Sequence, residues 1–495
     1  MAQASSILIA GLFRIFGESV LVERLYDLLV KSIMVSLSYA LILYFCKKSV
    51  SIIAVGMLLL WLLGTSAISG TAVVPVALLN LVAAILLLPA FVRNLSPWRL
   101  FLAGGIAGVD TLFRYDTGGA LLGIEALALA IAMYLARDTA GARFRAFVLA
   151  FLPCIAGFAV VFLPVAGLYL RNAPFADFRY DIITYPATYY YKGRNLPFPR
   201  IGLRHFENLE CYLPIAIILF AAYVLIFASC RPTASNSRHS FSSSHRLRRG
   251  FLIIFAILSL VMYFKGLVRI CPMQLYLCIT PSLLLLAVLF ASRDNLPKPA
   301  RWIVEGLAAL SLVAALWSVL HEVSDRAVNK SSVPAYLLRK ARHRMTPEES
   351  AWCVRPSPAT AGFCFNPGTD RIRAVDYILS RTTPDQRLFE GVSRHDKIFA
   401  NDNALYFDAQ RLPATKWSQF DPGLQNSVEV QSQIIDEFDR TRPPLIVLDS
   451  ELDEVNEPNA SSRSTGVMLL DDYIHAQYRK VETYGILTIW QRVAQ

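Results

Sequence analysis

Charged residues are scarce in this sequence, and their scarcity indicates a membrane protein. Only 17% of the 495 residues are Asp, Glu, Lys or Arg, whereas 55% are hydrophobic, and the mean hydropathy is +0.44. A soluble chain of this length needs a more polar surface. Residues 1–321 hold 27 Lys and Arg against 13 Asp and Glu, whereas residues 322–495 hold 21 against 24. The basic excess therefore lies in the apolar part, where it indicates anchoring at lipid headgroups rather than binding of nucleic acid.

Standard motifs of soluble enzymes are also missing. The sequence contains no GxxxxGK[ST] phosphate loop, no GxSxG nucleophile elbow, no HExxH zinc motif and no Gly-rich dinucleotide fingerprint. Its eight cysteines form no CxxC pair and no zinc spacing. Neither a metal nor another cofactor is indicated, so any chemistry must come from polar residues gathered at one face of a membrane.

Ten apolar runs predict an α-helical polytopic membrane domain over residues 26–321. Most approach the ~20 residues that a helix needs to cross ~30 Å of hydrocarbon. The run 98–116 is the weakest, because it contains Asp110, Arg114 and Asp116, and a half-inserted helix is the alternative there. The predicted spans are 26–46, 49–70, 71–92, 98–116, 118–136, 145–170, 212–229, 250–268, 271–291 and 302–321.

Lys and Arg are shared unequally between the loops on the two sides of the predicted spans. One side has fifteen over five loops, and the other has nine, six of them in the long loop 171–211. The more positive side is expected to be cytoplasmic. With ten spans, the N-terminal segment, the loop 171–211 and the C-terminal part then lie outside the cytoplasm. The Ser- and Arg-rich stretch 231–249 is expected to be a disordered cytoplasmic loop.

Residues 1–25 have neither the basic start nor the apolar core of a signal peptide. They predict an interfacial amphipathic segment, with a short re-entrant anchor as its simplest form. An N-terminus outside the cytoplasm has nothing upstream to carry it across the membrane. The alternative is that a first helix and an outer loop are missing from the front of the chain.

The loop 171–211 combines six Lys and Arg with a dense set of tyrosines, which includes Tyr189, Tyr190 and Tyr191. Aromatic faces bind carbohydrates, and Arg and Lys bind phosphates. We therefore consider Tyr189, Lys192 and Arg194 candidates for binding a lipid-linked sugar. An aromatic belt with snorkelling cations is the alternative.

Further cations are predicted on the side that disfavours them. Lys265 and Arg269 lie in a tight outer turn, FKGLVRIC, where a bound phosphate would explain their presence and snorkelling to headgroups is the alternative. Arg114 lies at the outer end of its predicted span beside Asp116. The two either pair with each other or contact the substrate, and Asp116 is a weak candidate for a catalytic residue.

Residues 322–495 predict a soluble, extracytoplasmic α/β domain. β-prone runs at 387–392, 397–402, 443–450 and 484–490 alternate with helical patterns near 370–381, 426–441 and 466–477. Cys353 and Cys364 are expected to form a disulfide in an oxidising compartment, with two unrelated thiols as the alternative. His395 is a candidate ligand-binding residue, although a structural role is the simpler interpretation. Asp471, Asp472 and His475 are expected on a solvated helix face.

Three stretches of sequence resemble the GT-C superfamily of membrane glycosyltransferases. They are AGLFRIFGESVLVERLYDLLVKSIMVSLSYALILYFCKK, FRYDTGG and YP…YYYKGRNLPFP. The resemblance is to bacterial relatives of the protein O-mannosyltransferases and to Rgt-type lipopolysaccharide glycosyltransferases. The C-terminal part is similar to soluble tails on members of that group.

This resemblance implies transfer of a sugar from a polyprenyl-phosphate carrier to a glycan, lipid or protein acceptor at the outer face of the cytoplasmic (inner) membrane of a cell envelope. In such enzymes the base is an acid in the first outer loop, and the likeness here begins after that loop. The start of the chain is therefore expected to be truncated, or the protein is a homologue without the usual catalytic loop. The alternative function is non-enzymatic, as a transporter or an assembly partner in envelope polysaccharide export. A transporter would be expected to show paired charges near mid-membrane and repeated halves. The sequence has few mid-span charges and no convincing repeat, so a transporter is the less favoured alternative.

Overall fold

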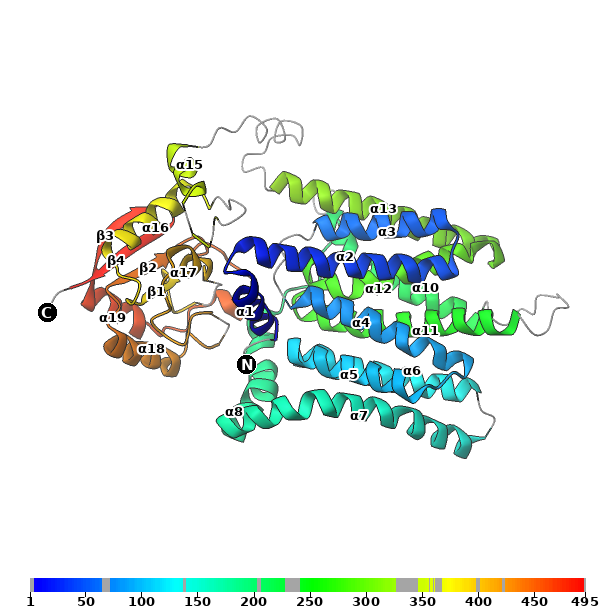
Figure 1. Cartoon of the computed structure of the whole chain (residues 1–495). Helices are drawn as coiled ribbons and strands as arrows, with labels where there is room; N and C mark the ends of the chain where they lie inside the picture. Colours follow the sequence, from blue (N-terminus) through cyan, green and yellow to red (C-terminus); the bar gives the residue numbers. More distant parts are fainter. Residues whose placement is uncertain are drawn as a thin grey trace. The chain divides into compact units, whose positions relative to one another are not determined.

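The chain folds into two compact units in the computed structural model (Figure 1). The first comprises Met1–Gly11, Arg24–Phe178 and Phe198–Ala341, and the second comprises Leu12–Glu23, Arg179–Pro197 and Arg342–Gln495. The structure describes residues 4–493 apart from 65–71, 137–138, 203–205, 228–240, 326–345, 356, 359, 361–366, 398–400 and 421–422.

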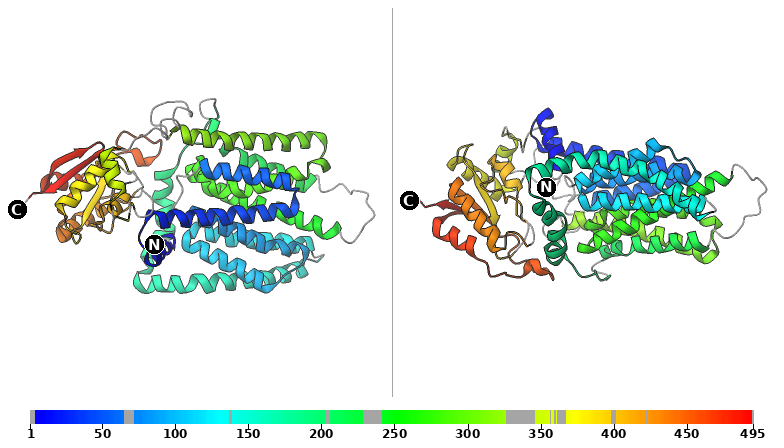
Figure 2. Two further views of the ribbon diagram at one scale, coloured as in Figure 1. Left: turned by 45° about the horizontal axis from the view of Figure 1, so that its top comes forward. Right: turned by 90° about the horizontal axis from the view of Figure 1, so that it is seen from below.

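The first unit is a bundle of apolar helices (Figure 2). Each of the ten predicted spans overlaps one of them. The helices are α2 (Val20–Phe45), α3 (Lys48–Gly64), α4 (Val73–Leu87), α5 (Pro97–Phe113), α6 (Tyr115–Ala136), α7 (Ala140–Asn172), α10 (Leu213–Phe227), α11 (Phe241–Gly266), α12 (Tyr276–Ala291) and α13 (Lys298–Asp325).

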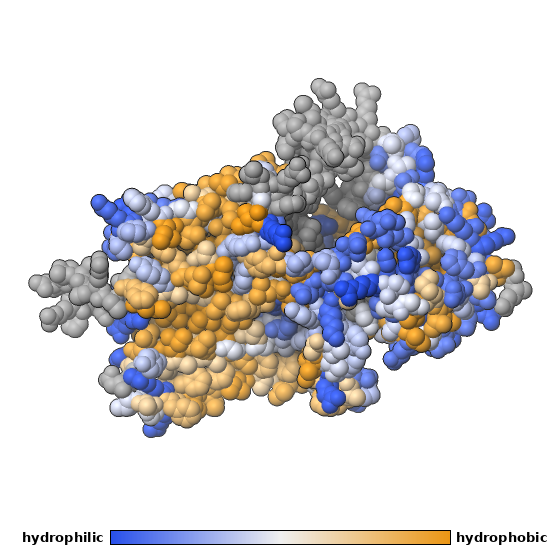
Figure 3. All heavy atoms as spheres, turned by 180° about the vertical axis from the view of Figure 1, so that it is seen from behind, coloured by the Kyte–Doolittle hydropathy of each residue, from blue (hydrophilic) through white to orange (hydrophobic). Residues whose placement is uncertain are grey.

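Seven stretches of the described chain are helices long and apolar enough to cross a membrane, which is consistent with a membrane protein. They overlap α2, α4, α6, α7, α10, α11 and α13. Helices α3 and α12 are apolar but have only 17 and 16 residues, and α5 also has 17. The count of ten spans therefore stays a prediction. Figure 3 shows a broad hydrophobic surface over the helical unit, as expected where side chains face lipid.

Helix α5, the weakest predicted span, packs closely inside this bundle. It lies against α4, α6 and α7. At Gly104 a β-carbon would overlap the Cys154 carbonyl group of α7, and at Gly157 one would overlap the Phe101 carbonyl of α5. Only glycine allows two backbones to approach this closely. The end of α5, which carries Asp110, is thus held firmly against its neighbours.

Residues 241–249, the described part of the stretch 231–249 that was predicted as a disordered loop, are helical. Helix α11 already begins at Phe241, so that residues 241–249 form its first turns. The Nη2 of Arg248 donates to the carbonyl oxygen of Phe45 at 2.9 Å. The Ser and Arg residues of this segment suggested a loop. A helix can nevertheless extend beyond its apolar span when the added residues are polar and have a packing partner. Residues 231–240 lie outside the described part of the chain.

The C-terminal part of the second unit is a three-layer α/β domain. Its sheet has the order β1-β2-β4-β3, in which β1 (Leu388–Val392) and β2 (Leu445–Asp449) are parallel and the other neighbours are antiparallel. One face carries α15 (Pro347–Cys353), α16 (Thr369–Arg381) and α17 (Ala404–Ala409), and the other carries α18 (Val428–Thr441) and α19 (Leu469–Gln477). Successive residues of β2 from Leu445 to Leu448 alternate between the two cores, since successive strand residues face opposite sides.

Most of the elements predicted for this domain are confirmed. The runs 387–392, 443–450 and 484–490 form β1, β2 and β4 (Leu487–Arg492), and the three helical patterns form α16, α18 and α19. The strand predicted at 397–402 is wrong for its described residues, because Asn401 and Asp402 belong to no strand. Strand β3 (Tyr478–Tyr484) was not predicted, because it lies at the sheet edge with mostly exposed side chains, so that its sequence has no apolar alternation.

Two segments distant in sequence complete the second unit. Near the end of α1 (Ala4–Phe16), the Phe13 ring stacks on Phe407 of α17 with 6.4 Å between centroids. The Val20 N–H donates to the Pro358 carbonyl oxygen at 3.3 Å. Residues 179–197 form a nearly continuous helical segment, made of the end of α8 (Phe175–Arg179), η3 (Tyr180–Thr184), η4 (Pro186–Tyr190) and α9 (Tyr191–Arg194). The N-terminal segment, the long loop and the C-terminal domain, which the loop charges predict to share one side of a membrane, all contribute to this unit.

Candidate functional site

A cluster of four charged side chains gathers in the first unit where α5 meets α6. Helix α5 ends at Phe113, Arg114 is extended, and α6 begins at Tyr115. The Arg114 N–H donates to the Asp110 carbonyl at 2.7 Å, and the Thr117 N–H donates to the Arg114 carbonyl at 3.2 Å. This abrupt junction leaves no loop between the helices. It therefore fixes the backbone on either side of Arg114.

Asp116 is the centre of the ion pairs in this cluster. Its carboxylate pairs with the Nζ of Lys265, near the end of α11, and with the Nε of Arg114 at 3.4 Å. The structure thus contains the pairing of Arg114 with Asp116, one of the two alternatives that the sequence left open. The side chains are 36% exposed for Asp116, 27% for Arg114 and 22% for Lys265. The cluster is thus open to a ligand on one side, while Asp116 is held by two cations.

Asp110 is the buried member of the cluster. Its residue is fully buried, and one carboxylate oxygen accepts a hydrogen bond from the Thr117 hydroxyl at 3.0 Å. Arg114 and Lys265 both attract this carboxylate electrostatically. With all four groups charged, two cations and two anions balance. A ligand phosphate would therefore have to replace a carboxylate as the partner of Lys265 or Arg114.

Arg269 lies close to this cluster in sequence. Helix α11 ends at Gly266, and the 3-10 helix η7 (Leu267–Arg269) follows immediately. A β-carbon at Gly266 would lie 2.8 Å from Leu275 Cδ2 and 3.3 Å from the Gln274 carbonyl oxygen. The absence of a side chain at Gly266 thus lets the chain pass close to Leu275 and Gln274 in this tight turn. The structure places Arg269 four residues beyond Lys265 on that turn.

The predicted residues Tyr189, Lys192 and Arg194 lie together in the second unit. The Tyr185 ring lies 6.2 to 6.4 Å from the rings of Tyr180, Tyr189 and Tyr190, and the Arg194 guanidinium lies over the Tyr190 ring at 5.6 Å. We call residues 179–197 the aromatic segment. The predicted site residues thus form two groups, one in each unit.

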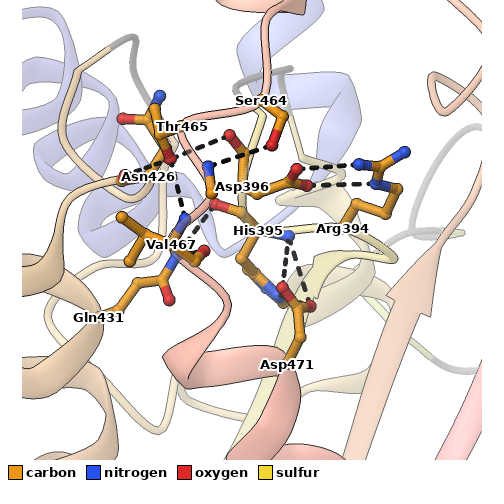
Figure 4. A network of polar contacts seen from close by, with 10 residues as sticks. Arg394, His395, Asp396, Asn426, Gln431, Ser464, Thr465, Val467 and Asp471 are labelled. Atoms are coloured by element: carbon orange, nitrogen blue, oxygen red, sulfur yellow. Dashed lines mark hydrogen bonds and ion pairs between the residues drawn. The ribbon is translucent and has the colours of Figure 1, made fainter.

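His395 is a buried structural residue in this fold (Figure 4). It is 1% exposed, its Nδ1 lies 2.8 Å from the Asp471 carboxylate, and its backbone N–H donates to the same carboxylate at 3.1 Å. The Gln431 side chain donates to the His395 carbonyl at 3.0 Å and accepts from the Leu470 N–H at the same distance. The network ties α18 and α19 to the end of β1. A side chain so enclosed has no direct access to a ligand, which favours the structural interpretation.

Asp471 is a residue whose position was predicted wrongly. It was expected on a solvated helix face, but it is only 4% exposed, whereas Asp472 and His475 are exposed as expected. The short sequence motif gave no hint of this, because the partner of Asp471 lies 76 residues earlier. Only the tertiary fold brings the two together.

An acidic cleft of about 250 Å³ opens beside the carboxyl ends of β1 and β2, and its lining residues are Val392, Asn401, Asp402, Asp449, Glu451, Leu452 and Asp453. Glu390 is fully buried behind it and accepts hydrogen bonds from Asn401 Nδ2 at 2.7 Å and the Asp402 N–H at 3.0 Å. Burial raises the pKa of the Glu390 carboxyl to about 8, although both hydrogen bonds oppose the shift. Among the described side chains, no three or more His, Cys, Asp or Glu are arranged to hold a metal ion.

Cys353 is disulfide-bonded, at the end of α15. Its predicted partner, Cys364, lies outside the described residues. The pairing of Cys353 with Cys364 therefore stays a prediction.

Comparison with known proteins adds no family to this geometry: no family model matches the chain, and no curated protein matches it.

Proposed function

We propose that this chain is a GT-C-like membrane protein that binds a polyprenyl-phosphate-linked sugar at the outer face of the cytoplasmic membrane. The single observation that supports this best is the cluster of Lys265, Arg114, Asp116 and Asp110 at the ends of apolar helices. Two of these residues belong to FRYDTGG, one of the stretches that resemble the superfamily. A lipid-linked phosphate needs cations at the end of an apolar helix bundle, and this cluster supplies them.

Each residue has a distinct role in this proposal. Arg114 and Lys265 bind the phosphate, Arg through its planar fork and Lys as a point charge. Asp116 holds both cations in place before the ligand arrives. Asp110, which accepts a hydrogen bond from Thr117, stabilises the positive charges of Arg114 and Lys265 at the junction. An ion-paired carboxylate is a weak base, so the ion pairs of Asp116 give no support to a catalytic role. We therefore propose binding of the donor and assign no residue to its transfer.

The test is binding of polyprenyl phosphate to the purified chain in lipid nanodiscs, with polyprenol as the ligand that lacks the phosphate and inorganic phosphate as the ligand that lacks the lipid. A charge-assisted hydrogen bond contributes ~1.5–3 kcal/mol, and this is an upper limit here because the phosphate replaces Asp116 as the partner of Lys265. The Lys265→Met variant should therefore bind polyprenyl phosphate more weakly, by up to roughly 150-fold. Binding of polyprenol should not change.

Two further variants control for damage to the fold. Lys265→Met with Asp116→Asn removes one cation and one anion, leaves Arg114 balanced by Asp110, and should remain deficient in binding. Arg301→Gln is the matched control, because it also removes an ion-paired cation: Arg301 is paired with Glu305 at 3.0 Å. Arg301 follows α12 in the chain, whereas Lys265 precedes this helix. This control should bind normally. Wild-type affinity in both Lys265 variants would refute the proposal.

A further inference from the structure

One contact between the aromatic segment and the C-terminal domain lies at a glycine, Gly423. Gly423 has a φ of +80°, a conformation that residues with side chains rarely adopt. A β-carbon at this position would lie 2.8 Å from Tyr189 Cβ and 3.0 Å from Tyr189 Cδ1. Glycine is therefore required at 423 for two reasons: its backbone conformation and the Tyr189 ring that lies against it.

A second contact holds the end of the same segment. Helix α9 packs against the 3-10 helix η10 (Ala460–Ser462) of the C-terminal domain. The loop around η10 is itself fixed, because the Asn459 side chain accepts from the Ser461 N–H at 2.9 Å and donates to Glu457 at 2.8 Å. Two points of contact, one at Tyr189 and one at α9, thus hold this segment on the domain.

Docking leaves tyrosine rings exposed. Tyr191, Tyr189 and Tyr180 are 51%, 43% and 39% exposed. Ordering a flexible loop costs ~1–2 kcal/mol per residue, so a loop already held in place binds a ligand with less entropic loss. Exposed aromatic rings beside Lys192 form a surface suited to the apolar faces and hydroxyl groups of a sugar.

We propose that the C-terminal domain holds the aromatic segment as a carbohydrate-binding platform, with Gly423 as a positioning residue for Tyr189. The chemical class of the ligand, a hexose carried on a lipid phosphate, rests on the function proposed above. The docking itself rests only on contacts within the second unit. Loss of the platform should weaken binding of the sugar, whereas binding of the phosphate depends on Lys265 and Arg114.

Docking is tested by cross-linking in the full chain. Tyr189→Cys with Gly423→Cys places the two β-carbons within about 1 Å of the ~3.5–4.5 Å that a disulfide spans. Oxidation by copper phenanthroline should join the tryptic peptides 180–192 and 417–440, detected by mass spectrometry without reduction. Each single-cysteine variant, and Ile183→Cys with Gly423→Cys, are the controls. If the 189–423 pair links no better than the 183–423 pair, docking is refuted.

A second measurement keeps docking testable should cysteine at 423 prevent folding. Tyr189→Ala retains the glycine and removes only the ring. Trypsin should cut the folded full chain after Lys192 at least roughly tenfold faster in this variant, since the segment loses its central contact. An unchanged cleavage rate would contradict docking through Tyr189.

Binding separates this inference from the proposed function. The wild type should prefer polyprenyl-phosphate hexose to polyprenyl phosphate, and Gly423→Ala should reduce that preference roughly tenfold, the loss expected for one aromatic contact. Affinity for polyprenyl phosphate should stay the same. In a Tyr189→Ala background, Gly423→Ala should have no further effect on the preference. An unchanged preference in Gly423→Ala refutes the platform and leaves the phosphate site standing, whereas wild-type phosphate binding in Lys265→Met refutes the proposed function instead.

Discussion

The buried carboxyl of Glu390 should make the C-terminal domain less stable as the pH rises. Burial raises its pKa from 4.5 to about 8 in the folded chain. Between these values the folded state binds a proton that the unfolded state has released. The free energy of unfolding therefore falls with increasing pH across this window. The contribution of Glu390 is fully present below about pH 4.5 and is lost by about pH 8, above which the free energy of unfolding levels off.

The size of the effect follows from the same shift. One proton taken up on folding changes the unfolding equilibrium at most roughly tenfold, or ~1.4 kcal/mol, per pH unit. The full window of about three and a half units would give ~5 kcal/mol as an upper limit, because the cleft beside Glu390 can admit water as the carboxyl ionises. Asn401 and the Asp402 N–H stabilise the ionised form, and the pKa of about 8 already includes their opposing effect.

Hydrogen exchange of the β1 and β2 amides, corrected for the intrinsic effect of pH, measures this directly in the full chain. Protection should decrease between pH 5 and 8 in the wild type. In Glu390→Gln the slope should be nearly flat, although protection at pH 5 should be lower, because the amide group of Gln accepts one hydrogen bond fewer than the carboxyl. Equal slopes in the two proteins would refute this assignment, and so would a flat profile in the wild type.

Three further outcomes are expected. Gly104→Ala should destabilise the helical bundle by ~1–3 kcal/mol or more, measured by thermal unfolding in detergent, because its β-carbon meets the backbone of α7, whereas Gly123→Ala, with open space around it, should be neutral or slightly stabilising. Cys353 and Cys364 should resist thiol labelling in the denatured, unreduced protein, and labelling of both would exclude the disulfide. A phosphatase reporter fused after Gln495 should be active outside the cytoplasm, since the loop charges predict that side for the C-terminal domain, and activity only of a cytoplasmic reporter would overturn the topology.

The secondary structure was largely predictable where local sequence determines it. Apolar runs near the length of a membrane span form helices whatever packs against them, and β1, β2 and β4 are short runs of β-prone residues between polar turns. Strand β3 and the start of α11 were missed because neither has an apolar pattern: Lys480 and Glu482 are on an exposed edge, and Arg246 and Arg248 extend a helix beyond its apolar part. In both places, tertiary contacts rather than local sequence stabilise the element.

The candidate site, too, was predictable only where its contacts are local in the sequence. Arg114 and Asp116 are two residues apart, so that their pairing could be predicted, and Lys265 could be recognised as a cation that needs an anion. Its pairing with Asp116 joins α11 to α6 and could not be read from spacing. Tyr189 was predicted to be functional only as part of a tyrosine-rich loop. Its contact with Gly423, 234 positions later, depends on a glycine whose role appears only in the folded backbone.

Asp116 also limits how strongly the cluster can bind a phosphate. Its carboxylate, together with that of Asp110, already balances Lys265 and Arg114. An incoming phosphate therefore gains only the difference between two anionic partners, and the displaced carboxylate must find water or another cation. On the proposed function, the cluster alone would therefore give weak affinity and little selection among phosphorylated lipids. Selection of a sugar-bearing lipid must then depend on contacts outside the cluster. Asp116→Asn should accordingly strengthen binding of polyprenyl phosphate without increasing the preference for the hexose-bearing lipid, and stronger preference in this variant would place sugar recognition at the cluster itself.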